Sequence, residues 1–172
     1  MRPTTTLPIT WTALHLLVHF NWFCGALIAA LLSAMIFAQD WTYRAFGFTP
    51  ASDIWPLLTG LKVIAALGLA AIPINHAILS RLIPIVETVR RRDPFVADNA
   101  YRLNTIAWAL LALQLISLAV AGVASLIRTP EYPLHMDAGF SIPGWLCVFF
   151  TFILARVFAE GTLMREELDG TI

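Results

Sequence analysis

Four long runs of apolar residues alternate with short polar connections along this chain. The runs cover about residues 11–38, 56–83, 106–127 and 142–158. About 20 apolar residues are enough for a helix to cross the hydrocarbon core of a bilayer, and every run is of that order. The pattern therefore predicts four transmembrane helices.

Brief connections between consecutive helices make neighbours antiparallel. We therefore predict an all-α membrane protein, with four transmembrane helices in an antiparallel up-down-up-down bundle that occupies residues 1–172 as a single domain. The first run is longer than the 7–15 apolar residues of a signal peptide, and only Arg2 precedes it. We expect it to be retained as the first span.

The composition agrees with this architecture and limits the classes of function to be expected. The chain is 59% hydrophobic and 13% charged, whereas soluble domains carry about 25% charged residues. Its formal net charge is +0, so no overall field recruits nucleic acid. No nucleophile–base–acid set and no Cys/His metal motif is recognisable, so we expect neither an enzyme nor a bound cofactor.

The arginines predict which way the protein faces. Cytoplasmic connections carry an excess of Lys and Arg. The connections outside the centre hold only Arg44 and Arg128 as cations. The central connection and its flanks hold more: Arg81, Arg90, Arg91, Arg92 and Arg102. We expect a cytosolic loop at 84–105, a cytosolic tail at 159–172 and both termini in the cytosol.

Two short stretches carry a resemblance. Asp93-Pro94-Phe95, followed by Asn99 and Arg102, precedes the third run, and a second stretch extends from Phe158 to the C-terminus. Together they resemble the bacterial domain-of-unknown-function 2975 family. The resemblance implies a four-helix protein of the bacterial inner membrane without an assigned activity. Members are often encoded beside a small helix-turn-helix regulator, which makes such a regulator a candidate partner.

The sequence departs from the family pattern at Val96, where a Ser or Thr is usual. A hydroxyl there would cap the following helix, and valine lacks one. We therefore expect the cap of that helix to come from elsewhere or to be weak.

We expect the loop and the tail to pack into one cytosolic cap that binds a partner. Loop arginines would face tail carboxylates, with apolar contacts from Phe95, Phe158 and Leu168. The cap residues are Arg91, Arg92, Asp93, Phe95, Asn99, Arg102, Phe158, Glu160, Gly161, Glu166, Glu167 and Asp169. In the alternative, the arginines only set topology and touch anionic lipid headgroups.

Two other functions stay open. His15 and His19 are four residues apart, and with His76 they could ligate haem or a metal in a membrane redox protein. A small transporter subunit, assembled as a homo-oligomer, is the third candidate. It lacks the internal repeats that such folds usually show. The leading expectation is an inner-membrane protein that contacts the lipid bilayer and binds or regulates a cytosolic partner, without direct contact to nucleic acid.

Overall fold

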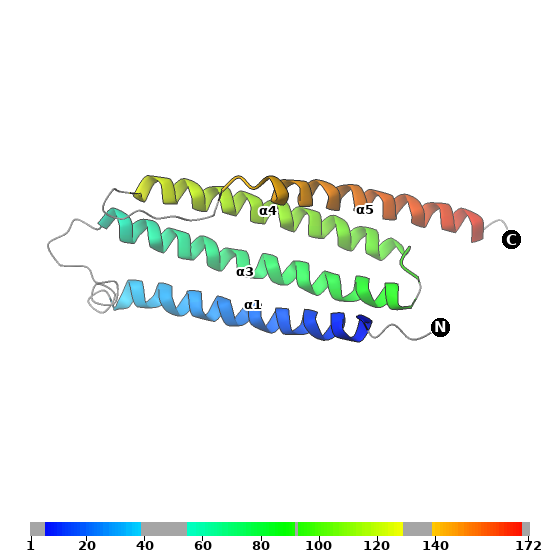
Figure 1. The fold of residues 1–172 in the computed structure, drawn as a ribbon, viewed down its shortest axis with the longest axis horizontal. Helices are drawn as coiled ribbons and strands as arrows, with labels where there is room; N and C mark the ends of the chain where they lie inside the picture. Colours follow the sequence, from blue (N-terminus) through cyan, green and yellow to red (C-terminus); the bar gives the residue numbers. More distant parts are fainter. Residues whose placement is uncertain (1–5, 39–54, 92, 129–138, 170–172) are drawn as a thin grey trace. The chain divides into compact units, whose positions relative to one another are not determined.

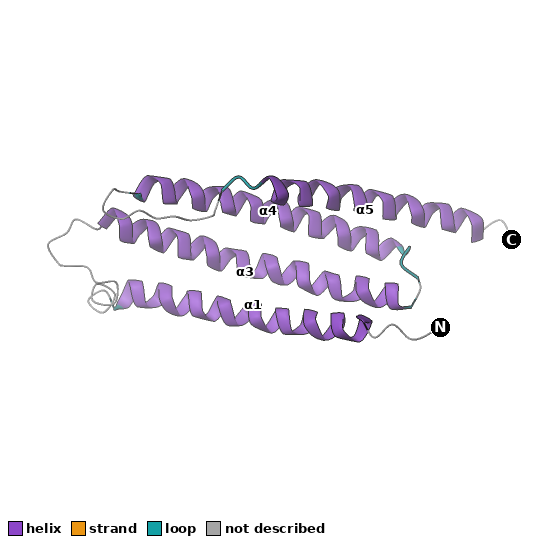
Figure 2. Cartoon of the chain, in the orientation of Figure 1, coloured by secondary structure: helices purple, strands orange, loops and turns teal. Residues whose placement is uncertain are grey.

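The computed structural model describes residues 6–38, 55–91, 93–128 and 139–169, with the side chains of 6–11, 166, 168 and 169 left out. Figures 1 and 2 show that the described part of the chain is almost entirely helical. The helices are α1 (Thr6–Phe37), α3 (Trp55–Arg90), α4 (Ala97–Ile127) and α5 (Ile142–Asp169). The described residues contain no strand. The predicted all-α fold is confirmed.

Each of the four helices is long and apolar enough to cross a membrane. The shortest, α5, has 28 residues, and at 1.5 Å per residue it is about 42 Å long, more than the hydrocarbon core of about 30 Å. By helix length and composition the chain is a multi-pass membrane protein.

The helices extend beyond the predicted spans at the end where α3 meets α4. Helix α3 passes through both Pro73 and Pro84 and ends at Arg90, while α4 begins at Ala97. Helix α5 continues without interruption from Ile142 to Asp169. Each of these three helices is therefore continuous through its apolar span and the polar sequence next to it.

Many large apolar side chains on these helices are exposed, including those of Phe20, Leu126 and Phe149. In water such a surface would be costly, at about 25 cal/mol for each Å² of apolar area. In a bilayer the same side chains contact lipid tails. The small set of buried apolar residues is therefore compatible with helices that face lipid.

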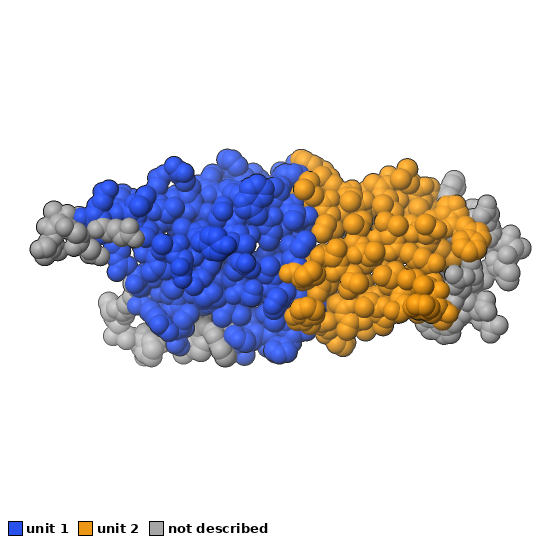
Figure 3. Space-filling view, turned by 180° about the vertical axis from the view of Figure 1, so that it is seen from behind, with its two compact units in different colours: residues 1–21, 74–113, 141–172 blue, residues 22–73, 114–140 orange. Residues whose placement is uncertain are grey.

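The chain forms two compact units, coloured separately in Figure 3. One unit comprises residues 22–73 and 114–140. In it, a Cβ at Gly25 would lie 3.0 Å from Cγ2 of Ile72, and a Cβ at Gly68 would lie 3.8 Å from Cδ1 of Ile28. The later residue of α1 thus meets the earlier residue of α3, so these segments run in opposite directions. Small residues permit this close approach.

Two serine hydroxyls accept hydrogen bonds from the backbone at the start of α5. Ser141 caps the helix, because its Oγ accepts a hydrogen bond of 3.2 Å from the backbone N–H of Gly144. Just before it, Gly139 has φ of +128°, which favours glycine, and its N–H donates to Oγ of Ser117 at 3.2 Å. The backbone N–H groups of Gly139 and Gly144 are therefore satisfied at the entry to α5.

The other unit comprises residues 1–21, 74–113 and 141–172. Trp108 of α4 meets Phe152 of α5 edge to face, with ring centroids 5.4 Å apart. Phe95, which precedes α4, meets Phe158, six residues further along α5. The order of these contacts requires α4 and α5 to be antiparallel here. The alternating direction of all four helices stays a prediction.

Candidate functional site

The turn between α3 and α4 is the structural centre of the cap. The N–H of Arg91 donates to the carbonyl of Glu87 at 3.0 Å, and the N–H of Asp93 donates to that of Thr88 at 3.0 Å. Pro94 then interrupts the helix, because the residue before a proline is pushed away from helical geometry. Helix resumes at Ala97.

Asn99 is the largest side chain in the described structure that is fully buried, with 0% exposure. Its Nδ2 donates to Oγ1 of Thr88 at 2.6 Å and to the carbonyl of Pro94 at 2.9 Å. Its Oδ1 accepts from Nη1 of Arg102 at 2.9 Å. Both amide hydrogens and the amide oxygen are therefore used, as a buried polar group requires.

The Asn99 amide joins three segments of backbone. Thr88 lies in the last turns of α3. Its hydroxyl accepts from Asn99 and donates to the carbonyl of Ile85 at 2.7 Å, which extends the hydrogen-bond network into α3. Pro94 belongs to the turn and Asn99 to α4. Losing one partner of such a network leaves the others unsatisfied, at about 1–3 kcal/mol each. The turn is consequently fixed to both helices by side-chain chemistry.

The first turn of α4 lacks a hydroxyl cap, as the presence of Val96 predicts. The carbonyl of Val96 accepts from the N–H of Asn99 at 2.9 Å, and the N–H of Val96 donates to the carbonyl of Pro94 at 3.1 Å. Asp98 lies in that first turn, where its negative charge favours the helix dipole. Backbone bonds and this carboxylate take the place of a side-chain cap.

Arg102 connects the buried amide to the surface. Its Nη1 reaches Asn99, while its Nη2 pairs with Oδ2 of Asp98 at 3.0 Å. Most of the Arg102 side chain is buried, whereas that of Asp98 is largely exposed. This arginine is thus held within α4 and is not presented to a tail carboxylate by these bonds.

The loop packs on α5 through an aromatic pair and a glycine. The rings of Phe95 and Phe158 have centroids 5.3 Å apart and planes inclined by 37°. Gly161 lies one turn further along α5, and a Cβ there would come within 2.9 Å of Cδ1 of Phe95. A methyl group at this position would collide with the ring. Glycine therefore opens the space that the Phe95 ring occupies.

One ion pair also joins loop and tail, and its polarity is opposite to the expected one. Arg165 of α5 pairs with the carboxylate of Asp93 in the turn. Both side chains are about half exposed, so the pair contributes little on its own, about 0–1 kcal/mol. The tail supplies the cation and the loop supplies the anion.

Five further charged side chains among the described residues of loop and tail pair within their own helices. Glu87 accepts from Arg90 and Arg91 on α3, at 2.9 and 3.0 Å. The guanidiniums of Arg91 and then Arg90 lower the pKa of the Glu87 carboxyl from 4.5. Glu160 pairs with Arg156 at 2.9 Å on α5. Three cations expected to face the opposite segment are therefore engaged locally, including Arg102.

The remaining predicted cap residues are placed only in part. Arg92 and the side chains of Glu166, Leu168 and Asp169 lie outside the described residues. Glu167 is exposed on α5. Whether any cap residue binds a partner stays a prediction.

The predicted histidine site has no supporting cluster in the described part of the chain. His15 and His76 are half-buried, and His19 is exposed with its Nδ1 2.8 Å from the backbone oxygen of His15. No group of three or more His, Cys, Asp or Glu side chains suited to a metal is found among these residues. The redox and transporter functions rest on the sequence alone.

Sequence reasoning missed several residues that build the cap. Thr88 and Arg165 are partners of Asn99 and Asp93, and Thr162 is buried beside Gly161, its hydroxyl donating to the carbonyl of Phe158 at 2.9 Å. One signal was available: a glycine inside a helix costs about 1 kcal/mol relative to alanine, which suggests a close approach at Gly161. Nothing in the spacing singles out Thr88.

The part of the chain that contains the cap matches a known protein family. The family model "Protein of unknown function (DUF2975)" matches residues 40–172, more than half of the chain. The chain belongs to the DUF2975 family. The predicted resemblance is confirmed, and the match includes α3, α4, α5 and both stretches of the cap. Searches of curated proteins and of solved structures each found no match.

Proposed function

We propose that this DUF2975 protein is a bacterial inner-membrane protein whose cap faces the cytosol and binds a protein partner there. The arginine excess of the central connection supports the orientation. The partner is a cytosolic protein, and a helix-turn-helix regulator is the candidate that the family context suggests. The protein acts by binding and not by catalysis.

The observation that carries the proposal is an exposed apolar surface on the part of α5 beyond its predicted span. Leu163 and Met164 are 59% and 60% exposed, and they follow the predicted end of the span at residue 158. With the span ending at residue 158, as predicted, these side chains lie in water, although the part of α5 that is apolar enough to span a membrane reaches Arg165. An apolar surface exposed to water is typical of an interaction site. Gly161 and Arg165, on either side of them, hold this segment to the loop.

The cap gives this surface a fixed position. A partner that binds a preformed surface loses less conformational entropy than one that binds a mobile tail. The Asn99 network fixes the turn, and the Phe95–Phe158 contact fixes α5 against it. The apolar pair on α5 is therefore presented on a rigid support.

Photo-crosslinking in cells tests the proposal. A photoreactive amino acid at Met164 should give a discrete protein adduct. The same group at Phe150, which is equally exposed within the span, should react with lipid. Mass spectrometry then identifies the adduct. If Met164 gives no protein adduct, or the same adducts as Phe150, the proposed function is wrong.

Orientation is tested separately. Cys24 and Cys147 are the free cysteines of the chain and are first replaced by alanine. A cysteine is then introduced at Arg91, whose side chain is exposed. A membrane-impermeant maleimide should label it only in inside-out vesicles. Labelling in intact spheroplasts would place the cap on the outer side.

A further inference from the structure

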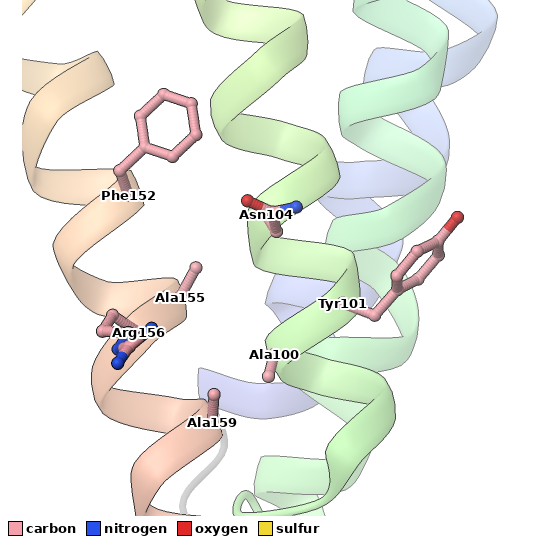
Figure 4. A pocket seen from close by; sticks show the side chains of 7 residues that line it. All are labelled: Ala100, Tyr101, Asn104, Phe152, Ala155, Arg156 and Ala159. Carbon is pink, nitrogen blue, oxygen red and sulfur yellow. The ribbon is translucent and has the colours of Figure 1, made fainter.

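A groove lies between α4 and α5, just inside the cap, and none of the predicted functions uses it. Its volume is about 420 Å³. The lining residues are Ala100, Tyr101, Asn104, Phe152, Ala155, Arg156 and Ala159 (Figure 4). All of them belong to one compact unit of the chain.

Both apolar side chains and a charged side chain line the groove. At one end lies the ring of Phe152, in edge-to-face contact with Trp108. One turn along α5, Arg156 lies between Ala155 and Ala159, with 80% of its side chain exposed. Three alanines, Ala100, Ala155 and Ala159, leave the space between the helices open. The groove is therefore mostly apolar, with the guanidinium of Arg156 as its one cationic group.

The groove coincides with the predicted membrane boundary. The third span is predicted to begin at residue 106 and the fourth to end at residue 158. By these predicted span ends, the groove residues on the two helices lie at headgroup depth. Trp108, exposed next to Phe152, fits the aromatic belt that marks this depth in membrane proteins.

We propose that this groove binds one anionic phospholipid. The phosphate lies at Arg156 and the glycerol and acyl chains lie over the alanines and Phe152. Arg156 uses Nε for its pair with Glu160, so its two terminal amino groups still offer four N–H donors. Figure 4 shows the Asn104 amide on the side of α4 that faces α5, with its oxygen toward α5. A rotation of the amide group turns its N–H donors toward the same side. The ring of Tyr101 points away from α5, so Tyr101 lies at the rim of the groove.

A lipid fits this site better than a second protein helix does. Charge complementarity favours an anionic group next to Arg156, and basic pockets between transmembrane helices on the cytoplasmic side are known to bind such headgroups. Glu160 opposes the anion, because it lies beside the same guanidinium. The affinity should therefore rise when the Glu160 charge is removed.

The chain offers a matched control for this arginine. Arg91 pairs with Glu87 through Nε at 3.0 Å and is 73% exposed, close to the 2.9 Å and 80% of Arg156. It does not line the groove. A general attraction of anionic lipid to exposed arginines would make both residues equally important.

Native mass spectrometry of the full chain in detergent tests the site, with dioleoyl phosphatidylglycerol and dioleoyl phosphatidylcholine as probes. We expect one phosphatidylglycerol to be retained in preference to phosphatidylcholine. Arg156→Gln should weaken that binding about fivefold, as expected for the loss of one cation near a headgroup. Arg91→Gln should leave binding unchanged, and Glu160→Gln should strengthen it. Circular dichroism confirms that each variant is folded.

Several results would overturn the lipid site. These are an equal loss for Arg156→Gln and Arg91→Gln, no loss for Arg156→Gln, or equal retention of the two lipids. Competition by excess inorganic phosphate would show that the site takes free phosphate. A dimer that forms through this groove without lipid would show that a second copy is the occupant. If Arg156→Gln does not fold, the increase with Glu160→Gln decides the question alone.

Discussion

The ring of Phe95 occupies the place that a side chain at Gly161 would need. A Cβ there would lie 2.9 Å from Cδ1 and 3.1 Å from Cε1 of the ring. Gly161→Ala should therefore displace Phe95, even though alanine favours a helix by about 1 kcal/mol over glycine. We expect the variant to be no more stable than the native chain and to be cleaved faster by trypsin at Arg90 and Arg91.

Gly122 provides the matched control within α4. A Cβ there meets nothing within 4 Å. Gly122→Ala should keep the helix-propensity gain, up to about 1 kcal/mol, and leave the cleavage rate unchanged. Thermal unfolding in detergent and limited proteolysis measure the two effects. Native cleavage rates in Gly161→Ala would mean that the Phe95 ring is not held by this contact.

Asn99 should be the cap residue least tolerant of substitution. Asn99→Ala removes the donor to the carbonyl of Pro94 and the acceptor of Arg102, leaving buried groups unsatisfied. The expected loss is about 1–3 kcal/mol of unfolding free energy. Asn104, exposed on the same helix, is the control, and Asn104→Ala should change stability by no more than about 0.5 kcal/mol. Equal effects of the two substitutions would contradict a structural role for the buried amide.

Helix positions could be predicted from the sequence because they depend on local features. Runs of apolar residues long enough to span a bilayer predict the four helices. The predicted span over 56–83 already includes Pro73, and α3 continues through Pro84 to Arg90. Proline weakens a helix locally, but the surrounding apolar segment and its neighbours decide whether the helix continues.

The chemistry of the cap could be predicted only in outline. The stretches around Phe95 and Phe158 were recognisable, but the pairing of their charges was not. A count of loop arginines and tail carboxylates predicts attraction between the segments. It does not reveal that Glu87 and Asp98 satisfy these arginines within their own helices. Ion pairs four residues apart form as soon as a helix forms, so they precede any contact between segments.

The Asp93–Arg165 pair should matter for local order and little for overall stability. Because both side chains are about half exposed, Asp93→Asn or Arg165→Gln should each cost at most about 1 kcal/mol. The double variant should lose no more than either single one. The charge-swapped chain, Asp93→Arg with Arg165→Asp, should recover native resistance to trypsin at Arg90 and Arg91. Additive losses in this cycle would show that the two residues act independently.

The carboxylate of Glu87 should make the end of α3 sensitive to acid. Arg91 and Arg90 lower its pKa in the folded chain below 4.5. A lowered pKa means that the folded state binds the proton less tightly than the unfolded state, so the contribution is complete above pH 4.5 and is lost as the pH falls through the lower, folded value. Glu87→Gln should therefore lower the melting temperature slightly near neutral pH, and the difference from the native chain should vanish in acid. A difference that persists well below pH 4.5 would show that the side chain acts by packing and not by its charge.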